Sequence, residues 1–254
     1  MDDSTSPNPQ SPGLQKRYAT ALSKIEQYKR TAYRPHTRKV KPVHDATSKI
    51  GGLPYLRSPT DWPVCPNCNH HLQLFLQLNS RIIPIDTWEG LIQLFYCTND
   101  ETGCESRLEA FFPFSKAVVC RKIEAGGKSS SQTPKISKLF AEKRIIGWET
   151  KADYPHYEEW DHLGIDLEID DETYELMHKT GAGVPLSGDK LFGWPFWVQS
   201  IEYPVDRQTG ALMNLLFQFD SQMQLPWMFG DAGIGHLTIS PDNAAELGFG
   251  WACT

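Results

Sequence analysis

The chain of 254 residues is 40% hydrophobic and 22% charged, which is the composition of a globular protein with one large or two modest domains. No apolar run approaches the roughly 18–20 residues that cross a bilayer, and residues 1–7 have neither the charged nor the apolar part of a secretory signal. We therefore expect a cytoplasmic protein without a membrane segment. The 18 prolines, 19 glycines and 11% aromatic residues favour short strands and turns over long helices, and the net charge is −6.

The N-terminal region is basic, with nine Lys or Arg against three Asp or Glu in residues 1–44. Residues 1–13 are rich in Ser, Pro and Asn and are predicted to be disordered. Apolar residues then recur every three or four positions, which predicts an amphipathic helix over 14–34 that ends at Pro35, with a connector to residue 47. Its cationic faces either bind nucleic acid or are a solvated surface of a helix that docks through its apolar stripe.

Four cysteines mark residues 48–123, the first of two predicted repeats. Cys65 and Cys68 form a Cys-x-x-Cys pair, and Cys97 and Cys104 follow after apolar runs that are predicted to be strands over 72–78 and 91–96. Zn²⁺ prefers four thiolates in a tetrahedron, and a tight turn can present two sulfurs to one ion. The pattern predicts one structural zinc ion without an open position for catalysis.

Other interpretations of these cysteines remain open. Cys65 and Cys68 are also spaced as a redox dithiol, and all four could be buried apolar residues. His70 and His71 follow the first pair and either replace a ligand or lie outside the metal's ligand set. Cys120 and Cys253 are expected to be ordinary thiols.

Two successive segments in the middle of the chain differ in composition and charge. Residues 124–137 have the composition of a flexible linker, and their Gly-Gly-Lys-Ser sequence lacks the first glycine of a phosphate-binding loop. Residues 138–189 form an acidic connector, with eleven Asp or Glu against one Lys between 149 and 175. A short strand is expected over 145–148 and a short helix over 171–178. The acidic surface either attracts a basic partner or is solvated and paired with the basic N-terminal region.

Residues 190–254 repeat the first segment at an offset of 141 residues up to Ser80 and of 143 residues from Leu91 onward. Strands are expected over 212–220 and 234–239. The aligned pairs are Lys49 with Lys190, Gly52 with Gly193, Asp61 with Glu202, and Gln77 with Gln218. Three of the cysteines align with Asp206, Thr209 and Ser240, so the second repeat is predicted to lack a metal. These features predict a β-rich α+β fold of two similar halves, related by a pseudo-two-fold axis and preceded by a helix.

No motif of an established catalytic class is present in the sequence. The most site-like residues are Asp231 and His236, which together with Asp220 would form an acid/base group in a cleft between the repeats. The alternative is a glycine-rich turn in which Asp231 caps backbone amides.

Several stretches of residues 48–254 resemble the YwqG-like family, a largely uncharacterised group. The resemblance rests on Ser48-Lys49-Ile50-Gly51-Gly52-Leu53-Pro54-Tyr55, Leu74-Phe75-Leu76-Gln77-Leu78, Leu191-Phe192-Gly193-Trp194-Pro195-Phe196-Trp197-Val198-Gln199, Leu215-Leu216-Phe217-Gln218-Phe219-Asp220-Ser221 and Phe229-Gly230-Asp231-Ala232-Gly233.

The first repeat also resembles the programmed cell death protein 2 family. In that family a Gly-Gly-x-Pro turn precedes Cys-x-x-Cys, a Phe-Leu-Gln strand and a further cysteine pair. Its members act as a dedicated chaperone of a ribosomal protein, so the resemblance implies a protein-binding role. The C-terminal region of that family has no match in this chain, so its client is not carried over, and neither family supplies catalytic residues.

The sequence therefore predicts a non-enzymatic, zinc-stabilised protein-binding module of chaperone, adaptor or toxin-neutralising type. A second hypothesis is an enzyme that uses Asp220, Asp231 and His236. The third is nucleic-acid binding through the basic N-terminal helix.

Overall fold

The computed structural model describes residues 11–254 except 86–87, 135, 137 and 222. The helices of the described residues are α1 (Pro12–Ile25), α2 (Cys104–Arg107), α3 (Trp160–Leu163) and α4 (Asp171–Thr180). The strands are β1 (Arg30–Lys39), β2 (Lys49–Ile50), β3 (Gln73–Asn79), β4 (Leu91–Tyr96), β5 (Val118–Ile123), β6 (Lys143–Asp153), β7 (Lys190–Phe192), β8 (Asn214–Asp220), β9 (Ile234–Ile239) and β10 (Leu247–Ala252). Short 3-10 turns include η1 (Glu26–Tyr28) and η4 (Tyr157–Glu159).

The described strands form one ten-stranded antiparallel sheet in the order β10-β9-β8-β7-β1-β6-β2-β3-β4-β5. The edge strands β5 and β10 contact each other, so the sheet curls into a near-barrel. The indole N–H of Trp251 on β10 donates to the hydroxyl of Tyr96 on β4, at 2.9 Å, across this closure. The prediction of a β-rich fold with an N-terminal helix is confirmed.

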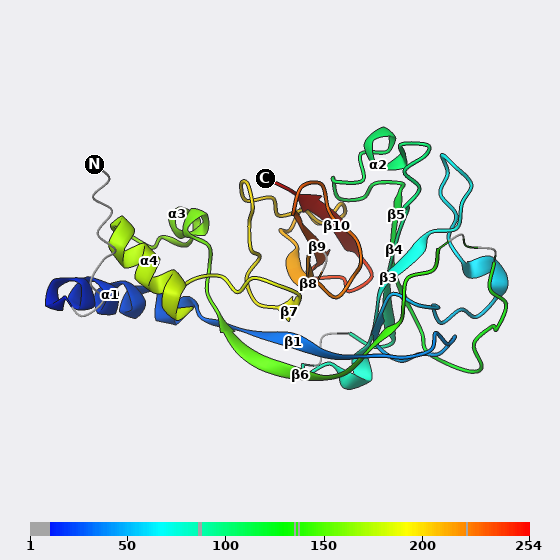
Figure 1. Ribbon diagram of the computed structural model, residues 1–254, viewed down its shortest axis with the longest axis horizontal. Coiled ribbons are helices and arrows are strands. Elements are labelled where there is room, and N and C mark those ends of the chain that lie inside the picture. Colours follow the sequence, from blue (N-terminus) through cyan, green and yellow to red (C-terminus); the bar gives the residue numbers. More distant parts are fainter. Residues whose placement is uncertain (1–10, 86–87, 135, 137, 222) are drawn as a thin grey trace, which may run out of the picture.

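Strands β1 and β6 form a long curved ribbon that carries the other strands on its two sides (Figure 1). On one side the order outward is β2, β3, β4, β5, and on the other it is β7, β8, β9, β10. Lys49 pairs with Gln77 on the first side and Lys190 with Gln218 on the second. A bulge interrupts β3 after Leu74 and β8 after Leu215.

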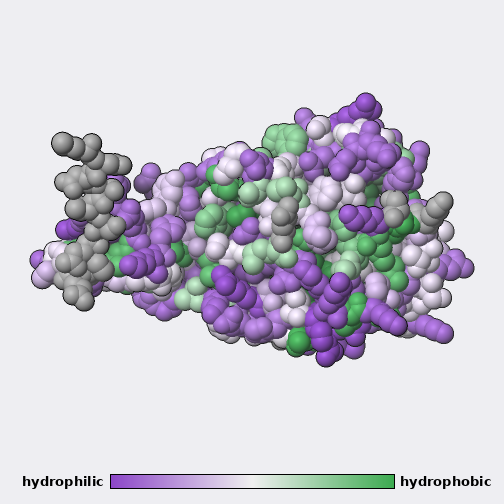
Figure 2. Space-filling view, viewed as in Figure 1, coloured by the Kyte–Doolittle hydropathy of each residue, from purple (hydrophilic) through white to green (hydrophobic). Residues whose placement is uncertain are grey.

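The core lies inside the curled sheet and is aromatic at its centre. Phe75 stacks on Tyr96 with ring centroids 4.9 Å apart, and Phe229 and Phe249 close the other side, at 5.7 Å from each other. A second, smaller cluster joins α1, α3 and α4 at the helical end of the molecule, where Ile25 and Met177 are fully buried. Hydrophilic side chains dominate this helical end in Figure 2, with apolar ones between them.

The N-terminal helix is shorter than its sequence pattern predicts. Helix α1 ends at Ile25, and β1 begins at Arg30, so the expectation of a helix to about residue 34 is wrong beyond η1. The periodic apolar residues all precede β1, and the pairing of β1 with both β6 and β7 makes residues 30–39 a strand. Pro35 does not end a helix but lies within β1, beyond the short stretch where β7 pairs with that strand. A missing backbone N–H is tolerated at such an unpaired edge.

The predicted strands at residues 72–78, 91–96, 212–220 and 234–239 are confirmed within two residues by β3, β4, β8 and β9, and the helix over 171–178 by α4. The strand predicted over 145–148 is longer and forms the central β6. Strand β10 was not predicted because alternating glycines weaken its sequence signal. Those glycines serve a close approach, since a side chain at Gly250 would meet the backbone carbonyl of Phe111 at 2.9 Å.

The predicted linker 124–137 contains neither helix nor strand in its described part. It nevertheless contacts the first half, where the Ser130 amide donates to the carbonyl of Leu56 at 2.8 Å. Most of the segment predicted to be disordered, residues 1–10, lies outside the described residues, while Pro12 and Gly13 already belong to α1.

Two fully buried lysines lie where the ends of β6 meet the two halves. The Lys49 ammonium is 3.2 Å from Glu142, which immediately precedes β6, and the Lys190 ammonium is 2.7 Å from Asp153, its last residue. Asp45 lies 2.7 Å from Lys49 as a second carboxylate. A buried charge is tolerated only when it is paired, so these ion pairs fix the halves onto the central ribbon.

Because Gly193 has no side chain, the Asp153 carboxylate can lie close to its backbone. Its φ is +83°, and a Cβ at this position would overlap that carboxylate. We expect Gly193→Ala to lower the free energy of unfolding by about 3 kcal/mol, from backbone strain and overlap together. Gly210 is a matched control, because its φ is +73° but the space around it is open, and Gly210→Ala should cost only about 1 kcal/mol. Equal losses in urea unfolding would show that strain alone explains Gly193.

Candidate metal centre and surrounding sites

Four cysteine sulfurs meet in the first half of the sheet. The Sγ atoms of Cys65, Cys68, Cys97 and Cys104 all lie within 4.8 Å of one another, and all four thiols are free. The distance is 3.7 Å from Cys65 to Cys104 and 3.8 Å from Cys68 to Cys97. Cys68 is half-buried and the other three are buried. The cluster could hold a metal ion, as its spacing in the sequence predicts.

Backbone geometry builds the cluster from two tight turns. The Cys65 amide donates to the carbonyl of His70 at 2.9 Å, and the Asn69 amide donates back to the carbonyl of Cys65 at 2.9 Å. Asn69 has a φ of +58°, which closes the turn. On the other side Gly103, also at +58°, starts α2 and places Cys104 at its first position. The His70 imidazole is bonded to Asn99 at 2.9 Å and is not among the clustered ligands.

The thiols of the cluster differ in acidity. Burial raises the pKa of Cys65 and of Cys97. Burial opposes ionisation of Cys68 as well, but hydrogen bonds from the His70 backbone, the Asn99 side chain and the His70 side chain lower its pKa to about 6. These hydrogen bonds favour the thiolate of Cys68, whereas burial opposes ionisation of Cys65 and Cys97, and a bound cation would favour the loss of their protons.

The second half builds the same turn without cysteines. The Asp206 amide donates to the carbonyl of Ala211, and the Asp206 carbonyl accepts from the amide of Gly210, both at 2.8 Å. The Asp206 carboxylate stabilises this turn, because it accepts from the amides of Gln208 and Thr209 at 2.7 and 2.9 Å. Among the described residues, the cluster of possible metal ligands lies in the first half.

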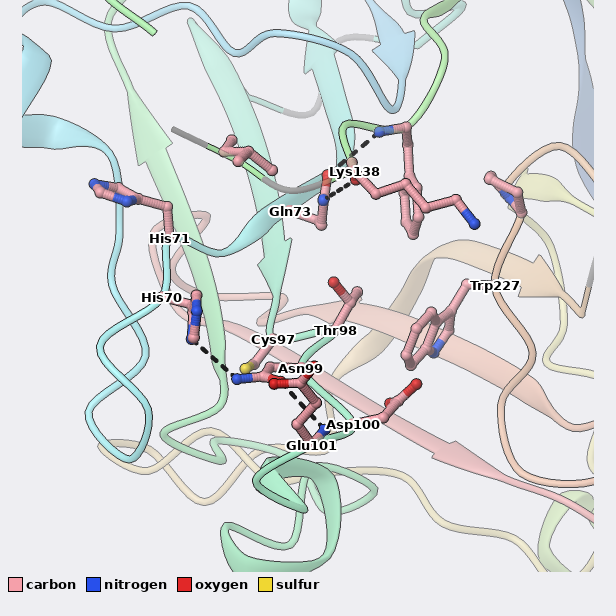
Figure 3. Close-up of a pocket in the computed structure, with 13 residues that line it drawn as sticks. His70, His71, Gln73, Cys97, Thr98, Asn99, Asp100, Glu101, Lys138 and Trp227 are labelled. Atoms are coloured by element: carbon pink, nitrogen blue, oxygen red, sulfur yellow. Dashed lines mark hydrogen bonds between the residues drawn. The ribbon is translucent and has the colours of Figure 1, made fainter. Parts of the chain in front are cut away.

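A polar pocket of about 440 Å³ adjoins the cysteine cluster, between the two halves. Figure 3 shows Asn99, Asp100 and Glu101 on one side of it and Lys138 and Trp227 on the other. The Nε1 of Trp227 is buried and has no hydrogen-bond partner among the described residues. This pocket occupies the cleft that the enzyme hypothesis requires.

The structure does not bring the three predicted acid/base residues together in that pocket. The Asp220 carboxylate accepts from the amide of Gly188 at 3.2 Å, and Asp231 is exposed in its turn. His236 is buried and lines a different cavity. The hydroxyl of Ser221 helps to close the turn, because it accepts from the amide of Phe229 at 3.0 Å, and the capping role of Asp231 stays a prediction.

An acidic groove lies at the helical end, and the acidic composition of residues 149–175 alone does not reveal it. The groove has a volume of about 860 Å³ and lies beside α3 and the start of α4. Its carboxylates come from Asp161, Asp166, Glu168 and Asp171, and its aromatic rings from Tyr157, Trp160 and Tyr174. Trp160 is only 7% exposed, and its Nε1 has no hydrogen-bond partner among the described residues.

The basic N-terminal helix pairs with part of this acidic segment. Arg17 on α1 lies 2.7 Å from both Asp170 and Glu172. The Lys24 ammonium donates to the backbone carbonyl of Asp166. Among the described residues, none of the four carboxylates that line the groove takes part in an ion pair.

None of the helices in the described part of the chain combines the length and the apolar character that a membrane crossing requires. The curated proteins contain no sequence match to the chain. One family profile, described as a domain of unknown function (DUF1963), matches residues 48–253, which include the cysteine cluster, both halves of the sheet and the acidic groove. The chain is therefore a member of the DUF1963 family.

Proposed function

We propose that the protein is a non-enzymatic, zinc-stabilised protein-binding module, of chaperone, adaptor or toxin-neutralising type, that binds a basic segment of its partner. The observation that carries this proposal is the acidic groove beside α3 and α4. Four carboxylates without ion pairs give it a negative potential, and three aromatic rings supply apolar contact area and faces for cations.

A basic peptide fits the charge of the groove. Lysine and arginine side chains of such a segment would reach Asp161, Asp166, Glu168 or Asp171, and the exposed ring of Tyr157 would contact its apolar parts. The groove thus provides both apolar contact and charge complementarity.

Nucleic-acid binding is less well supported, because part of the basic helix is already engaged within the molecule. Arg17 is occupied by Asp170 and Glu172, and Lys24 by a backbone carbonyl. A nucleic acid that approached α1 would also meet the carboxylates beside it.

The metal that we propose is zinc. Zn–S bonds of about 2.3 Å place the sulfurs of a tetrahedron about 3.8 Å apart. The two measured separations, 3.7 and 3.8 Å, agree with that edge length. Four thiolates fill the coordination shell, so the ion would stabilise the first half rather than bind a substrate. The cytoplasm, where we place the protein, would keep the thiols reduced for this purpose.

We further propose that the two halves arose by duplication and are related by a pseudo-two-fold axis. Matched strand order, matched pairing of Lys49 and Lys190, and matched bulges support this. Membership of the DUF1963 family is compatible with the resemblance to YwqG-like proteins. The resemblance of the cysteine-bearing half to the programmed cell death protein 2 family adds to the case for a protein-binding role.

Fluorescence anisotropy with a labelled Lys/Arg-rich peptide tests the groove. The double variant Asp166→Asn with Glu168→Gln should bind the peptide about tenfold more weakly at low salt, because two complementary charges are lost. The wild-type affinity should fall as salt is added. The control is Glu89→Gln with Glu109→Gln, which changes the net charge equally at exposed positions outside the groove. Equal losses in both double variants, or equal binding of an acidic peptide, would refute the groove as the binding site.

A further inference from the structure

A second cavity, of about 260 Å³, lies where the loop at residues 111–113 meets strands β9 and β10. Aromatic rings make up much of its wall, and its polar groups are few. The residues that matter here are Phe112, Trp197, Tyr203, Glu202, His236 and Gly250. His236 is 8% exposed, and its Nε2 has no hydrogen-bond partner among the described residues.

An arginine fills the corresponding place in the first half. There Gln77 pairs with Gln93, and Gln93 pairs with Arg121 on the edge strand β5. The Arg121 guanidinium donates to the side-chain oxygen of Gln93 and to the backbone carbonyl of Asp61, both at 2.8 Å. It also lies over the ring of Phe95, 5.0 Å from the centroid.

In the second half, the strand position that corresponds to Arg121 holds a glycine. Gln218 pairs with His236, and His236 pairs with Gly250 on the edge strand β10. His236 thus replaces Gln93, and Gly250 replaces Arg121. Glu202, which aligns with Asp61, lies at the exposed rim of the cavity. The two residues that accept from Arg121, Gln93 through its side chain and Asp61 through its backbone carbonyl, thus correspond to His236 and Glu202, whereas the arginine has no counterpart.

We propose that this cavity binds a guanidinium group, in the place that Arg121 fills in the first half. An arginine side chain of the partner supplies the group, and in this respect the inference rests on the proposed function. The cavity would then determine which basic segments are bound, because a lysine ammonium cannot reproduce the planar, two-sided donation of a guanidinium.

The chemistry of the walls suits a planar cation. Burial, and then the nearby charge of Lys190, lowers the pKa of His236 to about 3, so its imidazole is neutral near pH 7 and does not repel a cation. The indole of Trp197 and the hydroxyl of Tyr203 both donate to the buried carboxylate of Glu159, at 2.7 Å, which fixes their rings. Aromatic faces held in this way can stack on a guanidinium.

The cavity and the acidic groove are neighbours along the chain. Glu159 ends η4, and Trp160, whose indole lines the groove, follows it directly. One side of this short turn therefore supports the cavity through Trp197 and Tyr203, and the other contributes to the groove. A single basic segment can place an arginine in the cavity while its other residues contact the groove.

The experiment is an NMR titration of the full chain with N-acetyl-arginine amide, followed through the amide signals of β9 and β10. The matched neutral probe is N-acetyl-citrulline amide, which has the same shape without the charge, and it should bind at least about tenfold more weakly. Glu202→Gln, at an exposed rim position, should weaken the arginine probe severalfold, whereas Glu89→Gln should not. A citrulline probe that binds as well as the arginine probe would overturn the inference.

Variants at His236 provide a second test of the proposal. His236→Gln introduces the residue that accepts from Arg121 in the first half, and it should retain binding, while His236→Leu should lose it. Circular dichroism shows whether each variant folds. If His236→Leu does not fold, the effect of Glu202→Gln on binding of the arginine probe tests the proposal instead. Asp166→Asn with Glu168→Gln should leave binding of the small probe unchanged, which separates failure of the groove from failure of the cavity. An arginine peptide that binds while the free probe does not, and that is insensitive to Glu202→Gln, also overturns the inference.

Discussion

Cys65→Ser is expected to reduce the zinc content of the purified protein from one ion per chain to near zero and to destabilise the first half strongly. A structural zinc ion contributes about 10 kcal/mol or more to a small site, so the free energy of unfolding should fall by at least about 5 kcal/mol. The three remaining thiols cannot close a tetrahedron. Metal analysis by mass spectrometry and denaturant unfolding check the two parts of this prediction.

The loss should be confined to one half, and the repeated turn offers an internal reference. In the first half the Leu72 amide donates to the carbonyl of Pro63, and in the second the Met213 amide donates to that of Pro204, both at 2.9 Å. Hydrogen exchange should become fast at Leu72 in Cys65→Ser and stay slow at Met213. Cys253→Ser is the matched control, since Cys253 is half-buried outside the cluster and should cost less than about 1 kcal/mol. If both variants have the same stability and neither protein contains zinc, the metal centre does not exist.

The four-cysteine cluster was predictable because it depends on few residues. Two cysteine pairs around two strands specify a four-sulfur cluster almost regardless of the rest of the fold. The strands β3, β4, β8 and β9 were predictable for a similar reason, since each is a stretch of strand length that is rich in apolar residues. Helix α4 was found from its local pattern, and the structure shows it capped by Asp170 at one end and Gly181 at the other.

Features that depend on distant partners were not predictable. The apolar stripe that predicts the N-terminal helix ends before β1, and nothing in the mostly polar sequence of β1 indicates its pairing with β6 and β7. Strand β10 carries two glycines, whose purpose appears only when the loop at residues 111–114 is seen against them. The cavity at His236 has the same origin, because its walls come from three segments far apart in sequence.

The acidic segment illustrates the difference between composition and site. The sequence shows many carboxylates between residues 149 and 175, but it does not show which are neutralised. In the structure Arg17 engages Asp170 and Glu172, while Asp166 and Glu168 face the groove. Buried Asp153 and Glu159 belong to the same stretch but hold the core together. The carboxylates of Asp153, Glu159, Asp170 and Glu172 therefore have structural roles, and no sequence pattern separates them from Asp166 and Glu168.

Asp153→Asn is expected to cost about 4 kcal/mol of unfolding free energy, because it leaves the fully buried Lys190 without its partner. The Asp153 carboxylate also accepts from the amides of Tyr154, Leu186 and Trp194, at 3.0, 2.7 and 2.9 Å. An asparagine has one oxygen in place of two, so at least one of these donors loses its acceptor. Glu142→Gln in the other half should cost only about 2 kcal/mol, because Lys49 keeps Asp45 at 2.7 Å.

The cost of Asp153→Asn should also depend on pH. Burial lowers the pKa of Lys190 to about 8, although the charge of Asp153 opposes that shift, whereas the unfolded chain has a lysine pKa of about 10.4. Between these two pKa values Lys190 carries a proton in the unfolded state but not in the folded state, so the free energy of unfolding increases as pH rises. Removing the Asp153 carboxylate lowers the pKa of Lys190 in the folded protein further. The free energy of unfolding therefore increases more with pH in the variant than in the wild type. Its deficit should shrink between pH 6 and pH 10, measured against wild type by urea unfolding at each pH. A deficit that is constant with pH, or a Glu142→Gln variant that loses as much as Asp153→Asn, would show that the ammonium charge does not set the cost.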